Sequence, residues 1–533
     1  MTVLMHVLSR CSPALWPLLS ACLLILSFPP FDLAVLAWIA LVPLMVGLQG
    51  QPGVRSFLQG WGTGILFFAG LVQWIVLLGV VNWFEFIGAV LCLGLTVGLF
   101  GLAISVTSKH LSLPLVISAP ILWVTLEYVR SHAGVLRLPW GLLAHSQYLN
   151  LPLIQMASWT GVYGVSFLLV MANAALAQII LSIRKQRHVT PFQLPRPVVA
   201  QAVMAAVIIG GCHVYGYAVL SASPSFSSLR IAVIQANIPQ DAKWKPALRE
   251  RHLAEHVALT QETARRDHPS LIVWPELSVQ GRLQQDMQLR TRMTGLAQEV
   301  GGYLLVGSSV SPKFGNREFK EEHVFNSAFL IAPDGTVRGQ YNKIMLLPFA
   351  EYLPYKNLVA WPKRYVSMDD TVPGTEYTLF TVDGHRIAAL ICWETIFPDL
   401  VREFVQRGAE VIVNMTNEAW FGDTAAPYQF LSMNVFRAVE NRISIARSAN
   451  TGVSAVIDAY GRIIGRVEEQ GRDTFVEGFL TIDVPVRATV SMYSEYGDVG
   501  ALVFIGAVLG VMMTVYRFQG GRVLVQASKA YRS

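Results

Sequence analysis

Charged residues are scarce in this sequence, and the scarcity is uneven. Only 14% of the 533 residues are charged, whereas a soluble globular chain carries roughly 25%. Residues 1–222 hold 9 of the 41 basic residues and 3 of the 35 acidic residues. These counts exclude both a uniform globular protein and a protein that lies entirely within a membrane. They predict a polytopic membrane region joined to a water-soluble domain.

The soluble part also lacks an excess of positive charge. Net charge is +6 over residues 1–222, −4 over 223–516 and +4 over the tail that follows. The isoelectric point near 9.0 therefore comes from the membrane loops and the tail. A nucleic-acid partner has little support, because no basic stripe lies on the soluble part.

Eight apolar runs approach the roughly 20 residues that cross a bilayer. They cover residues 13–29, 33–49, 57–80, 86–107, 114–130, 161–183, 198–222 and 498–516. With a cytoplasmic N-terminus, 11 basic residues fall in cytoplasmic loops and two, Arg130 and Arg137, fall outside. This bias places the soluble domain on the outer face. The predicted division is a seven-helix membrane region over 1–223, an extracytoplasmic domain over 224–492, and a last helix with a basic tail over 493–533.

Cysteine is rare, and its distribution is informative. Cys11, Cys22, Cys92 and Cys212 lie in or beside the membrane runs, and Cys392 alone lies in the outer domain. A lone thiol cannot form an internal disulfide, and it is a liability in an oxidising compartment. Cys392 is therefore interpreted as a functional thiol, with a buried inert thiol as the alternative.

The outer domain alternates apolar strand-like runs with amphipathic helical stretches. Strands are predicted at 230–235, 271–274, 303–308, 328–332, 387–392, 411–415, 444–448 and 453–458, and helices near 246–266, 285–299, 398–407 and 427–442. Turn sequences at 333–335, 383–384 and 460–461 predict hairpins. The pattern indicates a layered α/β domain with a mixed sheet.

Three chemically different side chains follow or lie near predicted strands in this domain. Glu276 follows the 271–274 run, Lys343 follows residues 337–342, and Cys392 ends the 387–392 run. In layered α/β folds, side chains leave the sheet at strand ends and enter a crevice. A carboxylate, an ammonium and a thiol suggest covalent catalysis, with the carboxylate as proton carrier and the ammonium facing an oxyanion. The neighbouring ammonium is expected to lower the pKa of the thiol.

These residues carry a resemblance. Residues 274–276, 341–343 with 348–351, and 391–394 resemble the three signatures of the nitrilase (carbon–nitrogen hydrolase) superfamily. With seven preceding apolar runs and one following, nearly the whole chain resembles the bacterial apolipoprotein N-acyltransferases. The stretches 123–130, 138–140, 146–147 and 417–423 are also similar to that family.

The resemblance implies an αββα sandwich and assigns roles residue by residue. It implies that Glu276 is the general base, Lys343 the oxyanion-stabilising lysine and Cys392 the nucleophile. Supporting positions are Glu351, Glu394 and Trp393, and Trp244 is implied in a mobile loop over the site. Trp393 stands where the family more often has tyrosine, so it lacks a hydroxyl but keeps a backbone N–H as an oxyanion donor.

Several other residues have a functional and a structural interpretation. Apolar side chains for an acyl entrance are expected in the loop 348–354, at Phe349 and Tyr352, and around residues 420–421. For Trp420 and Phe421 the alternative is packing in the core. Glu127 and Arg130, one turn apart, are interpreted either as a pair near the membrane interface or as groups that act on a lipid head group.

No metal or cofactor is expected. His252 and His256, with Glu255 between them, match the inverted zinc-protease string. However, their helix is interpreted as amphipathic with these groups on its solvated side, and no third ligand is evident.

The predicted function follows from the membrane region as well as the site. Eight spans are more than an anchor requires, so both substrates are expected to be lipids that reach the thiol from the bilayer. The family resemblance implies a phospholipid acyl donor, typically phosphatidylethanolamine, and an acceptor that is a diacylated apolipoprotein. It further implies a ping-pong cycle through a Cys392 thioester in the bacterial inner membrane. The placement of basic residues puts the catalytic domain on the periplasmic side, and a monomer is expected. The alternatives are a membrane-tethered carbon–nitrogen hydrolase acting on a small substrate and a non-enzymatic transporter or lipid-binding scaffold.

Overall fold

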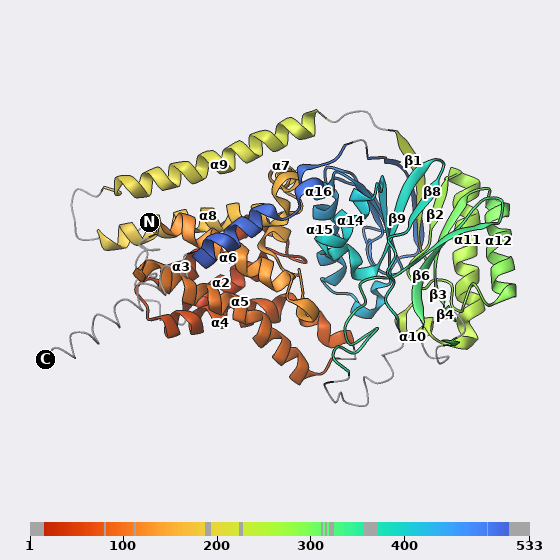
Figure 1. Ribbon diagram of the computed structural model, residues 1–533, viewed down its shortest axis with the longest axis horizontal. Helices are drawn as coiled ribbons and strands as arrows, with labels where there is room; N and C mark the ends of the chain where they lie inside the picture. The colour runs from red at the N-terminus through yellow and green to blue at the C-terminus, as the bar shows by residue number, and fades with distance from the viewer. Residues whose placement is uncertain are drawn as a thin grey trace. The chain divides into compact units, whose positions relative to one another are not determined.

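The computed structural model describes residues 15–510, except 79–80, 111–112, 187–192, 223–226, 311–312, 315–316, 319–323, 357, 359–370 and 488. The basic tail predicted beyond residue 516, and Arg10 and Cys11 before the first helix, lie outside the described residues. The contacts divide the chain into two units (Figure 1). Unit 1 comprises Met1–Gln73, Trp83–Ala218 and Asp498–Ser533, and unit 2 comprises Trp74–Asn82 and Val219–Gly497.

Unit 1 is helical. Its α-helices are α2 (Leu15–Leu26), α3 (Val42–Leu48), α4 (Gly53–Leu71), α5 (Trp83–His110), α6 (Leu115–Ser131), α7 (Leu151–Ile154), α8 (Ala157–Lys185) and α9 (Arg196–Ser221), followed by a further helix at Val499–Gly510. Short 3₁₀ segments η1 (Ala34–Trp38), η3 (Gly134–Leu136) and η4 (Leu143–Gln147) connect them.

Each of the eight predicted apolar runs contains a helix, but the helices differ in length. Within the part of the chain that the structure describes, three helices are long and apolar enough to cross a membrane, namely α5, α8 and α9. The second run is broken into η1 and α3. The third run was predicted to continue to residue 80, but α4 ends at Leu71 and the segment Trp74–Asn82 groups with unit 2.

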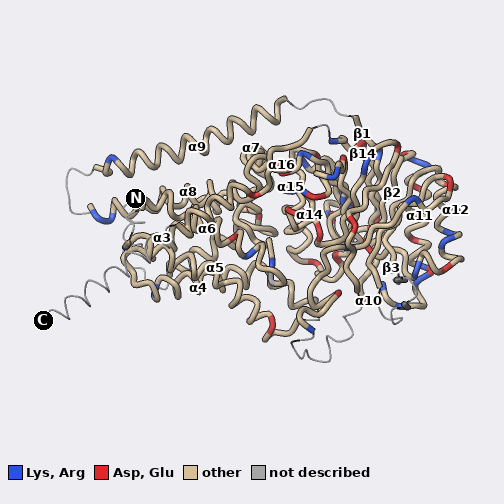
Figure 2. Tube along the Cα trace, in the orientation of Figure 1, with Lys and Arg blue, Asp and Glu red and all other residues tan. Residues whose placement is uncertain are grey.

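The surface of unit 1 is apolar. Figure 2 shows few coloured residues along α2–α9 and many on the two-sheet unit. Helix α9 buries only Ala205 and Gly216, while apolar side chains such as Val207 and Val214 are exposed. Such a helix is typical of a lipid-facing segment.

Small residues bring α4 and α5 close together. A Cβ atom at Gly64 would lie 2.6 Å from the Gly94 carbonyl oxygen and 2.8 Å from its Cα. Close backbone contact at small residues is the usual way in which membrane helices associate, because lipid supplies no hydrophobic force between them.

Unit 2 contains two six-stranded sheets. The first has the order β14-β1-β2-β3-β6-β7 and the second the order β13-β12-β11-β10-β9-β8. The strands of the first are β14 (Gly478–Pro485), β1 (Ser228–Gln235), β2 (Leu271–Val273), β3 (Tyr303–Val310), β6 (Phe325–Ile331) and β7 (Val337–Asn342). Those of the second are β13 (Ile463–Arg466), β12 (Ala455–Ile457), β11 (Ser444–Ala449), β10 (Val411–Thr416), β9 (His385–Ile391) and β8 (Leu379–Val382).

Helices cover the outer face of each sheet (Figure 1). α11 (Arg249–Asp267) and α12 (Met287–Val300) lie on the first sheet, and α14 (Pro398–Gln406) and α15 (Ala426–Asn441) belong to the second. The remaining short elements are η2 (Gln73–Leu78), α10 (Gln240–Lys243), η5 (Pro246–Leu248), β4 (Lys313–Phe314), β5 (Arg317–Glu318), η6 (Cys392–Ile396), η7 (Glu418–Phe421) and α16 (Met492–Tyr496). The predicted αββα sandwich with mixed sheets is therefore present.

The strand directions bring the candidate residues to one end of the sandwich. β1, β2 and β3 are parallel, as are β9, β10 and β11, with antiparallel strands at the edges. Glu276 follows the carboxyl end of β2 and Cys392 that of β9, while Lys343 follows β7. Each of the three predicted hairpin turns joins two antiparallel strands: β6 to β7, β8 to β9, and β12 to β13.

Candidate active site

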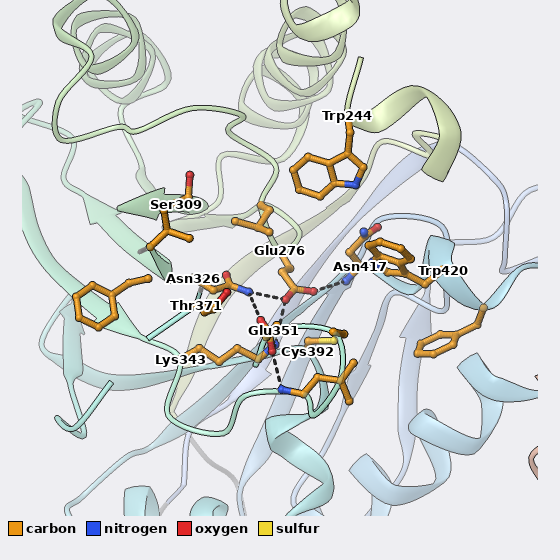
Figure 3. Close-up of a pocket in the computed structure, with 16 residues that line it drawn as sticks. Trp244, Glu276, Ser309, Asn326, Lys343, Glu351, Thr371, Cys392, Asn417 and Trp420 are labelled. Carbon is orange, nitrogen blue, oxygen red and sulfur yellow. Dashed lines mark hydrogen bonds and ion pairs between the residues drawn. The ribbon is translucent and has the colours of Figure 1, made fainter. Parts of the chain in front are cut away.

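Glu276, Lys343 and Cys392 line one cavity of about 320 Å³ in unit 2 (Figure 3). They come from both sheets, since β2 and β7 belong to the first and β9 to the second. An acid, an ammonium and a thiol that are far apart in sequence thus converge on a space that accommodates a small group.

The carboxylate of Glu276 is held by three donors. Its Oε1 atom accepts from Lys343 Nζ at 3.3 Å and from Asn326 Nδ2 at 2.8 Å. Its Oε2 atom accepts from the backbone N–H of Asn417 at 3.1 Å. Glu276 is 7% exposed. Both oxygens are therefore fixed in direction, which a proton acceptor in a reaction requires.

Lys343 lies between two carboxylates. Its Nζ atom is 3.3 Å from Glu276 Oε1 and 2.8 Å from Glu351 Oε2. Burial alone would lower the pKa of Lys343, but the carboxylates of Glu351 and Glu276 raise it above its ordinary value. The side chain is therefore an ammonium at any physiological pH, and a fixed positive charge faces the cavity.

Glu351 orients the lysine and the loop that carries it. Glu351 Oε2 accepts from the backbone N–H of Leu347 at 2.7 Å, and Oε1 accepts from Asn326 Nδ2 at 3.1 Å. Asn326 thus bridges the two carboxylates, and its amide joins Glu276 and Glu351 into one network (Figure 3).

Cys392 occupies a strained turn directly after β9, as the first residue of η6. Its φ of 57° is left-handed, which is uncommon for a residue with a side chain, and it is 9% exposed. Its carbonyl oxygen accepts from Asn414 Nδ2 at 3.0 Å, which ties the turn to β10. A sharp turn at the end of a strand presents the thiol to the cavity on a rigid support.

The prediction that the thiol has a lowered pKa is wrong for this structure. The pKa of Cys392 is raised to about 12, chiefly by burial. The carboxylate of Glu276 also raises this pKa, and its effect is larger than the opposite effect of the Lys343 ammonium. The sequence predicted the ammonium and both carboxylates in this site, but it did not reveal the burial of the thiol, which is the largest cause of its raised pKa, or that Glu276 outweighs Lys343. The resting nucleophile is therefore a neutral thiol, and a base must take its proton during attack.

Glu394 and Trp393 fasten the Cys392 turn to the loop after Lys343. Glu394 is fully buried, and its carboxylate accepts from the backbone N–H groups of Ile391, Ile344 and Met345 at 2.7, 2.7 and 2.9 Å. The hydroxyl of Tyr341 donates to the same carboxylate at 2.8 Å, and Trp393 Nε1 donates to the Met345 carbonyl at 2.6 Å. Both predicted supporting residues thus connect the nucleophile to the lysine loop.

Replacing Glu394 by Gln should destabilise unit 2. Every group that faces this carboxylate is a donor, so the amide of Gln would place an N–H against another donor. The expected loss is about 1–3 kcal/mol of unfolding free energy. It is measured by thermal unfolding in detergent, with Glu403→Gln on the exposed face of α14 as the matched control. An E394Q protein as stable as E403Q would remove Glu394 from this role.

The cavity walls contain some of the apolar residues expected and not others. Trp244 and Trp420 line the cavity and are 50% and 42% exposed, whereas Phe421 lines it but is buried. Phe349 and Tyr352 lie on the predicted loop and contact each other through a backbone hydrogen bond of 2.8 Å, but they are not among the cavity-lining residues. Their predicted part in the acyl entrance therefore has no support from the cavity wall.

Sequence reasoning missed three residues that shape the site. The role of Asn326 could not be predicted from the sequence, because a single Asn in an apolar strand is compatible with many structural roles. Asn417 lies in a stretch noted for its family resemblance, but the group that contacts Glu276 is its backbone N–H. Trp74, from the segment grouped with unit 2, packs edge-on against Phe421 with ring centroids 5.0 Å apart and donates to Gln429 Oε1 at 3.1 Å. Trp74 was missed because the apolar run 57–80 was interpreted as a single membrane span.

A buried ion pair anchors the 417–423 loop to the second sheet. Glu418 and Arg447 form an ion pair with both side chains fully buried. Arg447 also donates to Asn414 Oδ1 at 2.7 Å, and Asn414 in turn holds the Cys392 carbonyl. This network joins the loop that carries Trp420 to the turn that carries the thiol.

Two pairs of polar residues that the sequence left open to interpretation are buried, namely Glu127 with Arg130 and His252 with His256. Glu127 accepts from Trp123 Nε1 at 2.9 Å, and Arg130 donates to the Trp140 carbonyl at 2.6 Å, with both side chains inside unit 1. These contacts hold both side chains within unit 1, and the two roles suggested for the pair stay predictions. His252 and His256 were expected on a solvated face, but they are 4% and 1% exposed, because α11 turns them toward the first sheet.

Known proteins match this chain over most of its length. Residues 20–175 match the family model described as apolipoprotein N-acyltransferase N-terminal domain, and residues 230–487 match carbon–nitrogen hydrolase. A curated apolipoprotein N-acyltransferase from Geobacter metallireducens is 36% identical, covering 94% of this chain and 95% of that protein. One from Chlorobaculum tepidum is 28% identical over 94% of this chain and 96% of its own length. A solved amidase of the nitrilase superfamily from Nesterenkonia AN1 has 21% identity and a TM-score of 0.37, covering 50% of this chain and 93% of that chain.

Proposed function

Because the chain belongs to the apolipoprotein N-acyltransferase family, we propose that it transfers an acyl chain from a phospholipid to the N-terminal diacylglyceryl-cysteine of lipoproteins. One observation carries this proposal: Glu276, Lys343 and Cys392 line the same cavity, with exposed tryptophans in its wall. The reaction needs a nucleophile, a proton carrier, an oxyanion partner and an apolar approach for the acyl chain, and this cavity contains candidates for all four.

The first half-reaction forms a thioester. Glu276 accepts the Cys392 proton as the sulfur attacks the ester carbonyl of the phospholipid. The Lys343 ammonium and the backbone N–H of Trp393 stabilise the resulting oxyanion. When the intermediate collapses, Glu276 returns the proton to the departing alkoxide, and a lysophospholipid leaves. The acyl chain is then bound to sulfur and no redox step or cofactor is required.

The second half-reaction uses the same groups in reverse. The free α-amine of the diacylated lipoprotein attacks the thioester carbonyl, and Glu276 accepts the proton that the amine loses. The thiolate leaves and is reprotonated, and an amide is formed. Water must be kept away from the thioester between the two steps, because hydrolysis would turn the transferase into a lipase. Trp244 and Trp420 at the cavity are suited to this shielding.

The apolar helices support a membrane location. We infer a multi-pass protein of the bacterial inner membrane, with up to eight crossings and unit 2 on the periplasmic side, because cytoplasmic loops carry most of the basic residues. On the basis of the family, we propose phosphatidylethanolamine as the donor, and we propose a monomer as the working form.

The proposal predicts acylation of a lipopeptide in a defined system. Purified protein is incubated with phosphatidylethanolamine vesicles and a synthetic diacylated lipopeptide, and the products are identified by mass. We expect a triacylated peptide and one lysophospholipid for each peptide acylated. The matched control is the same lipopeptide with an acetylated α-amine, which should leave the thioester to accumulate on the enzyme.

Two outcomes would contradict the proposal. One is the absence of any acylated peptide from protein that retains its fold. The other is release of ammonia from small amides without lipid, which would identify a membrane-tethered carbon–nitrogen hydrolase.

A further inference from the structure

A second buried lysine lies beside the cavity, and the proposed cycle does not use it. Lys243 is the last residue of α10, immediately before Trp244, and it is 2% exposed. A lysine is almost never buried unless its ammonium has partners. The contacts of this side chain therefore indicate what it does.

Lys243 is bonded to the backbone of the candidate base. Its Nζ atom donates to the main-chain carbonyl of Glu276 at 2.9 Å. The side-chain amide of Gln280 donates to the main-chain carbonyl of Lys243, and the same amide lies 3.1 Å from His252 Nδ1. Helix α10 is thus joined at two points to the segment that follows β2.

The turn that carries Glu276 needs such support. Leu277 has a φ of 48°, so the backbone immediately after the base is left-handed. The turn also packs against Gly307, where a Cβ atom would lie 2.6 Å from the Leu277 nitrogen. A strained turn keeps its shape only when its surroundings determine it, and a buried carbonyl needs a donor.

The charges around Lys243 favour its ammonium form at neutral pH. Burial lowers the pKa of Lys243 to about 8, while the carboxylate of Glu276 opposes that change. The other titratable groups that face it are His252 and His256. Burial lowers the pKa of both, that of His256 to about 4, so both are neutral near pH 7. Raising the pH through about 8 therefore removes the charge of Lys243 before that of Lys343.

We propose that Lys243 is a positioning residue for acyl transfer: it holds the backbone of Glu276 in place relative to Cys392 and fixes Trp244 at the cavity. The charged form does this best, because a hydrogen bond from an ammonium is stronger than one from an amine. This inference rests on the proposed function of the same site, and it adds a pH-dependent element that the three cavity residues do not supply.

The test compares Lys243→Met with the wild type across pH 6.5–9.5. Two rates are measured: thioester formation from phosphatidylethanolamine, and alkylation of Cys392 by chloroacetamide, located by peptide mass. At pH 6.5 the wild type should exceed K243M about 10- to 100-fold in both. The ratio should fall above pH 8, because wild-type Lys243 then loses its proton and its hydrogen bond to the Glu276 carbonyl weakens. Groups that titrate equally in both proteins cancel in this ratio.

Two further variants keep the test decisive. Lys243→Arg retains the charge at every pH, so its rates should lie near wild type at pH 6.5 and exceed them progressively above pH 8. Lys245→Met removes an exposed lysine on the other side of Trp244 and should match the wild type. If K243M does not fold, the test is the comparison of K243R with the wild type across the same pH range.

The inference is overturned by a K243M protein that equals the wild type at pH 6.5, or by ratios that stay constant with pH. Its failure is distinguishable from failure of the proposed function. Wild-type protein that forms no thioester but loses chloroacetamide reactivity on K243M substitution would contradict the acyl transfer alone. Normal thioester formation in K243M would contradict the role of Lys243 alone.

Discussion

Replacing Cys392 by Ala should abolish the acyl-enzyme and reduce lipopeptide acylation by roughly 10⁴-fold or more, as removal of a catalytic nucleophile does elsewhere. Among the described residues that line the cavity, Cys392 is the one cysteine, and it lies at the strained turn after β9. The thioester is a covalent species, so the measurement is direct: the intact mass of the protein after incubation with phospholipid alone.

The matched control for this experiment is Cys92→Ala. Cys92 is a free thiol exposed on α5 of unit 1, and its removal should leave the adduct unchanged. An adduct that persists in C392A, or one that disappears in C92A, would mean that the nucleophile is misassigned. Because the mass reports chemistry on the enzyme itself, the result does not depend on whether the lipopeptide docks.

The position of these residues at strand ends was accessible from sequence because β-strands leave a strong signal. The runs before Glu276 and Cys392 are short, apolar and rich in β-branched residues, and each is followed by a polar side chain and a turn. The structure has strands there, at β2 and β9. Such local patterns, together with proline at the first turns of helices, were sufficient to predict the layered α/β fold of unit 2.

What the sequence did not reveal are properties that depend on long-range packing. The pKa of Cys392 is decided by burial and by the sum of two carboxylates and an ammonium, and no sequence spacing gives those distances. The orientation of α11 on the first sheet, which buries His252 and His256, is likewise a tertiary property. Trp74 was misassigned because hydropathy does not distinguish an apolar side chain that faces lipid from one that packs against Phe421.

The raised pKa of the thiol gives Glu276 a quantitative role. Because its pKa is raised well above the ordinary value of a thiol, Cys392 is a neutral thiol at pH 7 in the absence of a base. Replacing Glu276 by Gln should therefore slow thioester formation by roughly 10²- to 10⁴-fold, the usual contribution of general base catalysis. The amide of Gln retains the size of the side chain and an oxygen toward Asn326, but its NH2 group faces the backbone N–H of Asn417. Thermal unfolding of E276Q is therefore measured beside the rate, so that a loss of fold is not counted as a loss of base catalysis.

The pH dependence of the Glu276→Gln variant separates a base from a structural carboxylate. Without an internal base, the thiol must lose its proton to hydroxide, so the rate in E276Q should rise about tenfold per pH unit between pH 5.5 and 7.5. Loss of the negative charge of Glu276 also lowers the pKa of the thiol, because Glu276 is the largest charge that raises it. The rate of thioester formation in E276Q should therefore keep rising with pH until that lower pKa is reached. Wild-type protein should show no such dependence on hydroxide over the same range.

Glu299→Gln, a change on α12 away from the cavity, serves as the control. Thioester formation in E276Q at the wild-type rate, or a slow rate that does not rise with pH, would show that Glu276 only orients Lys343.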